Sequence, residues 1–279
     1  MKRFFRLLLI CGVIGFVYLC WNTDSVLYDL KEYFGIKEES YQTYDAAWNI
    51  YYDSLTEIEK KIYAKMIECS NDYEESWKPF DTSITEENIE NAYTAVLYDH
   101  PELFWLDQGY SYQYLENMGI VEVKLSYNET LDNIDEAKQL FDSSVNTILD
   151  NANMYESDEE KERYVHDILI EMIEYDESAS LNQSAYSALV NHRTVCAGYA
   201  KAFQYLMQKL DIPCYFVVGQ SEGQQHAWNL VYINSRWMNV DVTWDDGLDD
   251  PYYFFNKNDS FFEESHSRDL ISQSLPTCE

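Results

Sequence analysis

TVCAGYAKAF (Thr194–Phe203) is the stretch that decides the fold of this 279-residue chain. Cys196 stands at the start of a predicted helix, whose apolar residues follow at helical spacing: Ala200, Phe203, Leu206, Met207 and Leu210. A helix N-terminus offers unpaired N–H groups and the positive end of the helix dipole, which favour a thiolate and can hold an oxyanion. Free cysteine is also among the most buried residue types, so this stretch alone leaves a structural role open.

Three strands are predicted after this helix: Cys214–Gly219, His226–Ile233 and Arg236–Trp244. Only Asn234-Ser235 separates the last two. A two-residue loop pairs residue 233 with residue 236 and places His226 and Asp241 on one face of the hairpin, as diagonal neighbours. A three-residue loop would change the parity and put them on opposite faces.

A thiol, an imidazole and a carboxylate therefore follow one another along the chain. Nucleophilic acyl transfer needs a thiolate that attacks, a base that activates it and an acid that orients the base. Cys196, His226 and Asp241 supply these groups in that order. A lone histidine is more often structural, but a diagonal carboxylate beneath it is typical of an orienting group. His166, at the edge of a helix's apolar face, is interpreted as structural.

These blocks resemble the transglutaminase-like superfamily, in particular its bacterial membrane-anchored or secreted members. The resemblance covers roughly residues 160–265 and rests on VCAGYA, HAWN and VDVTWD, which begin at Val195, His226 and Val240. Tyr253-Phe254-Phe255 and His266 are also similar to the tail of these domains. One departure is Thr194, since a glycine commonly stands two residues before the cysteine.

The resemblance implies an α+β fold with a papain-like core, in which the cysteine helix packs on an antiparallel sheet that carries the histidine and the aspartate. It also implies roles for the three residues. Cys196 would be the nucleophile, His226 the general base and acid, and Asp241 the orienter.

Composition excludes several classes of function. The net charge is −31, and only three of the 19 basic residues lie in residues 1–21, which leaves 50 acidic against 16 basic residues in the remainder. Such a chain repels nucleic acid, and we expect no nucleic-acid partner. We find no G-x-G-x-x-G, no P-loop, no C-x-x-C and no H-E-x-x-H, so neither a cofactor nor a metal is expected. The acidic loop with Asp245, Asp246, Asp249 and Asp250 lacks EF-hand spacing and is predicted to be a solvated turn.

Residues 1–21 are predicted to be a signal anchor. Lys2, Arg3 and Arg6 precede the apolar run Leu7–Trp21, which is short for a membrane span and suits a signal-peptide core. No small-x-small cleavage site follows, so an uncleaved anchor is favoured, with the positive flank inside the cell and the rest at the cell surface. A cleaved segment would make the protein secreted. In that oxidising compartment, a disulfide among Cys69, Cys214 and Cys278 is conceivable.

The remaining organisation follows from helix and strand signals. Residues 22–50 are interpreted as a stalk and first segment, 51–128 as a small α+β region, and 129–279 as the transglutaminase-like domain. Capping boxes predict helices that start at Thr56 with Glu59, at Ser83 with Glu86 and at Ser157 with Glu160. A hairpin is expected around residues 103–127, and a further helix at 130–150.

Two functions remain open at this stage. The first is a cell-surface cysteine enzyme that acts on a peptide or protein amide, by hydrolysis or by cross-linking. The alternative is a non-catalytic surface module that binds a peptide or a cell-wall component in the same groove. The sequence does not indicate an oligomeric state.

Overall fold

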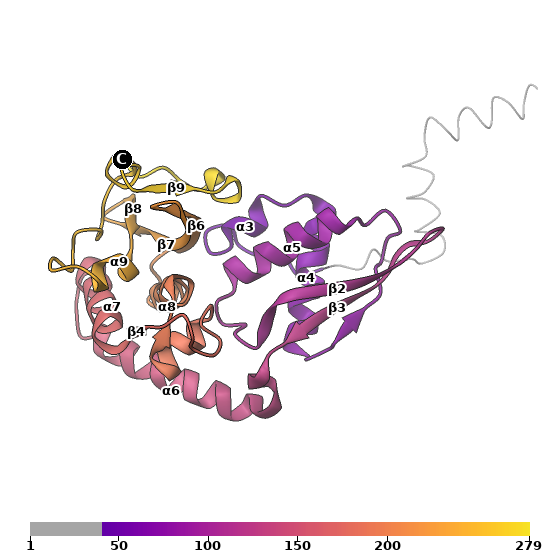
Figure 1. Ribbon diagram of the computed structural model, residues 1–279, viewed down its shortest axis with the longest axis horizontal. Helices are drawn as coiled ribbons and strands as arrows, with labels where there is room; N and C mark the ends of the chain where they lie inside the picture. The colour runs from indigo at the N-terminus through magenta and orange to yellow at the C-terminus, as the bar shows by residue number, and fades with distance from the viewer. Residues whose placement is uncertain (1–40) are drawn as a thin grey trace, which may run out of the picture. The chain divides into compact units, whose positions relative to one another are not determined.

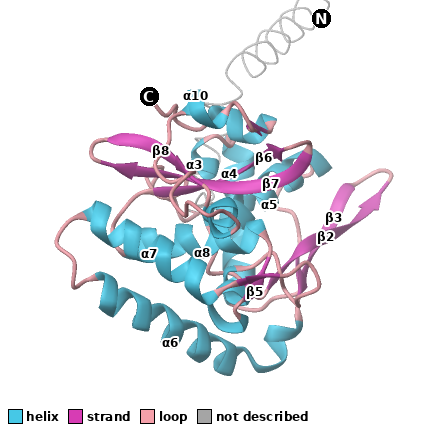
Figure 2. Ribbon diagram, turned by 60° about the vertical axis from the view of Figure 1, so that its left-hand side comes forward, coloured by secondary structure: helices cyan, strands magenta, loops and turns pink. Residues whose placement is uncertain are grey.

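A four-stranded antiparallel sheet carries the residues of interest, in the strand order β8-β7-β6-β9. The strands are β6 (Cys214–Ser221), β7 (Gln224–Ile233), β8 (Arg236–Val240) and β9 (His266–Arg268). In this computed structural model, which describes residues 41–279, helix α8 (Cys196–Lys209) packs against β6 and β7. Helix α7 (Asp158–Met172) lies beside α8, and α6 (Ile134–Ala152) lies beneath these two helices, away from the sheet (Figures 1 and 2). The predicted mixed α+β class is confirmed.

The β7–β8 hairpin has the predicted register. Ile233 pairs with Arg236, and the two loop residues Asn234 and Ser235 both have positive φ, 52° and 64°. That conformation matches the twist of the strands in a two-residue hairpin. The ladder ends at Asn229↔Val240, however, so the third strand predicted to reach Trp244 was too long.

Asp241 ends that strand because it caps a helix. Its side chain accepts the N–H of Trp244, and the short helix α9 (Val242–Asp246) follows. An aspartate at this position satisfies a backbone donor that a continuing edge strand would leave without a partner.

Helix α8 begins at Cys196 as predicted, and nearly all of its residues from Ala197 to Met207 are buried. Asn229 donates its side-chain N–H to the carbonyl of Ala200, which ties the helix to β7 at 2.9 Å. Truncating a fully buried residue of this helix such as Phe203 costs about 3–5 kcal/mol in comparable cores. At Gly198, an added Cβ would lie 1.8 Å from Thr194 Oγ1, so this turn of the helix requires glycine when Thr194 is present.

The N-terminal part of the described chain contains three helices and a second sheet. The helices are α3 (Ile50–Asp53), α4 (Glu57–Asn71) and α5 (Glu86–Asp99), and the sheet has the order β1-β3-β2, with β1 (Ser76–Trp77), β2 (Leu106–Leu115) and β3 (Gly119–Tyr127). The capping boxes at Thr56 and Ser157 are confirmed. The start of α5 was placed two residues early: Thr85 is the N-cap, and it exchanges hydrogen bonds with Asn88, while the Ser83 N–H is bound to Asp81.

The remaining elements connect these layers. A short parallel pair joins β4 (Glu174–Tyr175) to β5 (Arg193–Thr194), immediately before Cys196. A 3-10 turn over Glu129–Asn133 precedes α6, a π-helical turn covers Ser187–Asn191, α10 is Asp259–Phe262, and a last 3-10 turn covers Leu270–Ser274.

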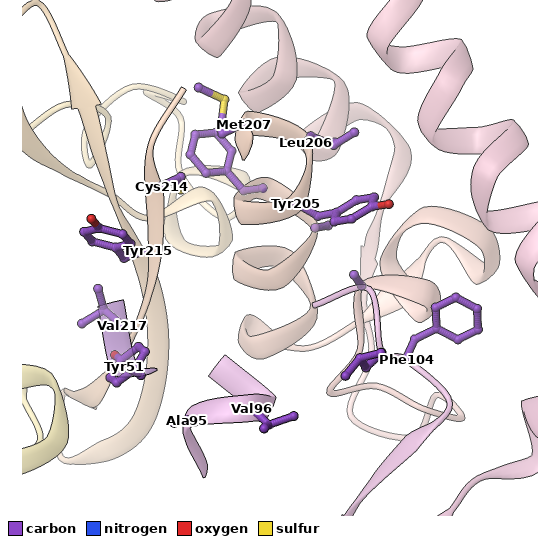
Figure 3. Close-up of a cluster of buried hydrophobic side chains, with 14 of the residues drawn as sticks. Tyr51, Ala95, Val96, Phe104, Tyr205, Leu206, Met207, Cys214, Tyr215 and Val217 are labelled. Atoms are coloured by element: carbon purple, nitrogen blue, oxygen red, sulfur yellow. The ribbon is translucent and has the colours of Figure 1, made fainter. Parts of the chain in front are cut away.

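Buried side chains connect the N-terminal helices to the sheet. The cluster runs from Tyr51 to Cys278, and Figure 3 shows part of it between α8, β6 and the N-terminal helices. The Tyr51 hydroxyl donates to the carbonyl of Phe216 at 2.7 Å and lies 3.1 Å from Ser272 Oγ. Residues 43–279 form one compact unit, and the functional division at 128/129 stays a prediction.

Two sequence predictions concern the cell envelope. The proposed anchor, residues 1–21, lies outside the described residues, and within residues 41–279 no helix is both long and apolar enough to cross a membrane. Cys69, Cys214 and Cys278 are all buried free thiols, so no disulfide joins any two of them in this structure.

Candidate active site

Cys196 is the first residue of α8 and is partly exposed. The first N–H groups of a helix have no partner within the helix. Hydrogen bonding to the preceding residues begins at Gly198, whose N–H donates to the carbonyl of Val195. The N–H groups of Cys196 and Ala197 therefore lie outside this ladder, next to the thiol.

His226 lies on β7, opposite Gly219 of β6. Its Nε2 atom is 2.6 Å from Oδ2 of Asp241, and the Cys196 side chain is close enough to the ring to act on its pKa. Burial disfavours protonation of His226, but the adjacent Asp241 carboxylate and then Cys196 outweigh it and raise the pKa of His226 to about 10. The imidazolium form is therefore strongly stabilised when the thiol is ionised.

Asp241 is fully buried and reaches His226 from the cap of α9 rather than from a strand. Burial alone would raise the pKa of this carboxyl, but His226 and His266 outweigh the effect and hold it below its usual range. The structure thus brings Cys196, His226 and Asp241 together. The expected contact between His226 and Asp241 is present, although the local geometry at Asp241 differs from the predicted strand.

A second histidine binds the same carboxylate. His266 Nε2 lies 3.0 Å from Asp241 Oδ2. In the sequence, His266 stands out only as part of a tail similar to that of transglutaminase-like domains, and no role is predicted for it. It lies 25 residues beyond Asp241 on β9, and no local pattern links the two residues.

The acidic loop after Asp241 is not simply solvated. Asp245 is buried; it accepts a hydrogen bond from the N–H of Phe254 at 2.7 Å and lies 3.0 Å from His166 Nε2. The side chain of Asp246 accepts the Tyr199 hydroxyl at 2.6 Å. Two of the four predicted turn carboxylates therefore support the fold, because each has a donor positioned by a neighbouring helix or loop.

His226, Asp241 and His266 are also the kind of residues that bind metals, and their ligand atoms lie within 4.8 Å of one another. Two ligands of one tetrahedral zinc ion are about 3.3 Å apart when each bond is about 2.0–2.1 Å. The separations of 2.6 and 3.0 Å between Asp241 Oδ2 and the two Nε2 atoms are hydrogen-bond distances instead. The cluster is therefore better described as one carboxylate shared by two histidines.

Cys196 and His226 line one cavity of about 520 Å³. The other lining residues are Tyr175, Ser221, Glu222, Gln224, Gln225, Thr243, Trp244, Asp246, Gly247 and Leu248. Its walls come from the β6–β7 turn on one side and from α9 and the following loop on the other. A cavity of this size holds an extended side chain or a short peptide segment.

Comparison with known proteins shows which proteins this region resembles. Residues 147–242 match the model of the transglutaminase-like superfamily, and this range contains Cys196, His226 and Asp241. The chain is 29% identical over 160 residues to the kyphoscoliosis peptidase of Homo sapiens, which covers 48% of this chain and 24% of that protein. It is 29% identical over 140 residues to the Mus musculus kyphoscoliosis peptidase, covering 40% and 21%. The chain thus spans about a quarter of the length of these curated relatives.

Two solved structures are also similar. A crystal structure of a TGase has a TM-score of 0.34 and 16% identity, covering 59% of this chain and 49% of that chain. The periplasmic domain of TgpA from Pseudomonas aeruginosa has a TM-score of 0.32 and 11% identity, covering 46% and 55%.

Proposed function

We propose, from the premise that residues 147–242 form a transglutaminase-like domain, that this protein is a cysteine acyl-transfer enzyme that acts on a peptide or protein amide. The observation that carries the proposal is the position of His226. One of its ring nitrogens is held by the buried Asp241 carboxylate, and the ring lies close to Cys196, with which it lines one cavity. A nucleophile, a base and an orienting acid in hydrogen-bond contact are what such catalysis needs.

The proton positions follow from the acceptor character of the carboxylate. Asp241 Oδ2 accepts only, so Nε2 of His226 carries a hydrogen and Nδ1 is left to take the proton of the Cys196 thiol. The thiolate attacks the amide carbonyl carbon, and the carbonyl oxygen becomes an oxyanion beside the free N–H groups at the start of α8. The imidazolium then gives its Nδ1 proton to the leaving nitrogen as the C–N bond breaks. The product is an acyl thioester on Cys196 and a free amine or ammonia.

The second half-reaction decides the type of enzyme. If water attacks the thioester, with His226 as general base, the result is hydrolysis; if an amine attacks, the result is a new amide and a cross-link. Both routes use the same residues. The cavity wall carries Glu222 and Asp246, which would favour an amine-bearing group over an anionic one.

Labelling of the thiol tests the proposal. We expect iodoacetamide to alkylate Cys196 far faster than the buried Cys69, Cys214 or Cys278. The Cys196→Ala variant should lose the fast reaction, His226→Ala should slow it strongly, and Cys69→Ala should leave it unchanged. Equal labelling of all four thiols, or a rate that does not depend on His226, would contradict the proposal.

Turnover separates the enzyme from a binding module. A burst of p-nitrophenolate from p-nitrophenyl acetate, followed by slow steady release, would show that Cys196 forms and loses an acyl group. Fast alkylation with no acylation at all would instead favour the non-catalytic module that binds a peptide or wall component.

The location is proposed from the sequence alone. Residues 1–21 would anchor the chain, and the strongly acidic remainder would lie at the cell surface and meet peptide or protein substrates there. Protease treatment of intact cells tests this, since residues 41–279 should be digested only if they are outside. Protection in intact cells and digestion after lysis would place them inside.

A further inference from the structure

We propose that His266 is a positioning residue of this site, which holds the Asp241 carboxylate in place and keeps the proton of His226 on Nε2. The catalytic consequence of this inference rests on the proposed function, whereas the hydrogen-bond arrangement does not. His266 reaches the site on β9, where it pairs with Ser221 at the edge of the sheet opposite β8.

The first argument is the number of donors that Asp241 needs. The side chain of Asp241 is 0% exposed, so water does not satisfy its oxygens. Oδ1 accepts the N–H of Trp244 at 3.1 Å, and Oδ2 accepts from His226 at 2.6 Å and from His266 at 3.0 Å. Without His266 the buried carboxylate would keep two donors, Trp244 and His226. It would lose the third donor, which helps to fix the position of Oδ2.

The second argument is that each donor meets an acceptor along the hydrogen bonds from Ser265 through His266 to Asp241. An ionised carboxylate only accepts, so Nε2 of His266 carries a hydrogen. Its Nδ1 lies 2.8 Å from Ser265 Oγ, and the hydroxyl can donate there. In this arrangement His266 donates from Nε2 and accepts at Nδ1, so both ring nitrogens have partners, and both histidines present Nε2–H to Asp241. This form of His226 leaves Nδ1 for the proton of Cys196.

The third argument is rigidity. The His266 residue is 4% exposed, and its ring lies 4.7–5.3 Å from the ring centres of four aromatic residues: Trp228, Trp244, Phe254 and Phe262. Turning the imidazole would require this group to repack. The ring is thus held at the carboxylate as a fixed donor.

A spectrum of the full-length protein labelled with ¹⁵N-histidine tests the arrangement without any activity. We expect a hydrogen on Nε2 of both His226 and His266, and an unprotonated Nδ1 at His266. At neutral pH we also expect a protonated Nδ1 at His226, whose pKa is raised to about 10. The two signals are assigned by their loss in His226→Ala and His266→Gln. An Nδ1–H tautomer at His266 would overturn the inference. The result is independent of whether Cys196 turns over a substrate.

The pH profile of Cys196 alkylation by iodoacetamide tests the positioning role. His266→Phe keeps an aromatic ring and removes the donor, whereas His266→Gln keeps a donor near the same place. We expect His266→Phe to slow alkylation at neutral pH about tenfold to a hundredfold and to shift the profile, because the buried Asp241 carboxylate loses a hydrogen-bond donor and no longer holds His226 in one position. His266→Gln should recover part of the rate.

Phe261→Leu is the matched control, because Phe261 packs on Phe254 and Phe262 of the same aromatic group, whereas no ring contact joins it to His266 in the described part of the chain. It should keep the wild-type profile. A folded His266→Phe protein with the wild-type rate and profile, or a Phe261→Leu protein with the same shift, would overturn the inference. If His266→Phe does not fold by circular dichroism, His266→Gln and the tautomer spectrum decide. If the wild type and His226→Ala are alkylated at the same rate, the proposed function is rejected. The tautomer result does not depend on that rate and would still hold.

Discussion

His166 Nε2 lies 3.0 Å from Asp245 Oδ2, and both side chains are completely buried. This contact connects α7 to the helix that Asp241 caps. Since Asp245 also accepts the N–H of Phe254, the pair fixes the loop that follows α9. The structural role predicted for His166 is therefore specific: its hydrogen bond with Asp245 holds α9, the helix that Asp241 caps, against α7.

Replacing His166 with leucine should destabilise the protein by about 3 kcal/mol, because a buried carboxylate loses its strongest partner. Denaturant unfolding of the variant measures this loss. The double variant His166→Leu with Asp245→Asn should be less damaged than the sum of the two single variants. Additive losses would show that the two side chains are not coupled.

Stability should fall as the pH rises from about 5 to 8, because of buried carboxyl groups. Burial raises the pKa of Glu162 from 4.5 to about 8 and that of Asp99 from 3.8 to about 7. At a pH between the unfolded and the folded pKa of each group, the folded chain holds a proton that the unfolded chain has released. Folding is therefore favoured at low pH, and this contribution to stability is lost as the pH rises through the folded pKa values. Unfolding free energies measured between pH 5 and 9 test the slope.

Glu162→Gln isolates one of these groups. Glu162 accepts the Asn256 amide N–H, while Glu162 Oε1 and Asn256 Oδ1 have no donor among the described residues. A proton on Oε1 would turn this atom from an acceptor without a donor into a donor, and a glutamine amide nitrogen at the same position would be a donor at every pH. We expect the variant to be more stable than the wild type at pH 9, on the order of 3 kcal/mol, and close to it at pH 5. An unchanged slope would rule out Glu162 as its source.

Gly219→Ala should slow alkylation of Cys196 by displacing β9. A Cβ at this position would lie 2.1 Å from the carbonyl oxygen of Ser267 and 2.7 Å from Trp228 Cη2. The strand that carries His266 would have to shift, which weakens the contact with Asp241. Gly109→Ala is the control, since a Cβ there meets nothing within 4 Å. Equal alkylation rates in the two variants would show that β9 can adapt without loss.

Tyr175→Phe should slow acylation of Cys196 by p-nitrophenyl acetate at least about tenfold, and leave alkylation by iodoacetamide unchanged. Tyr175 lines the cavity and pairs with Thr194, two residues before the cysteine. Burial and then the charge of Cys196 raise the pKa of its phenol, so the hydroxyl keeps its hydrogen at neutral pH and can donate it. Only acylation forms an oxyanion, so only acylation would lose a hydrogen-bond donor.

Tyr253→Phe is the control for this variant, since Tyr253 is 47% exposed, close to the 48% of Tyr175, and does not line the cavity. Parallel loss of both reactions in Tyr175→Phe would point to a general disturbance of the site.

Local signals predicted a large part of this structure. The helix starts at Thr56, Ser157 and Cys196 depend on residues within one turn, and the register at Ile233 and Arg236 depends on a two-residue loop. The errors arose where distant residues decide. Asp241 is not part of the strand because its side chain accepts the N–H of Trp244 at the start of α9 and also accepts from two histidines. One of these, His266, lies on the later strand β9, so no local pattern could predict the contact.

Thr194 lies so close to Gly198 that the side chains at these two positions would compete for the same space. A Cβ at 198 would lie 1.8 Å from Thr194 Oγ1 and 3.0 Å from the carbonyl oxygen of Ser184. Gly198→Ala should therefore be strongly destabilised, and adding Thr194→Gly should restore part of the loss, because it removes the nearer atom while Ser184 still has to shift by a few tenths of an ångström. Grafting either residue without its partner would displace Cys196.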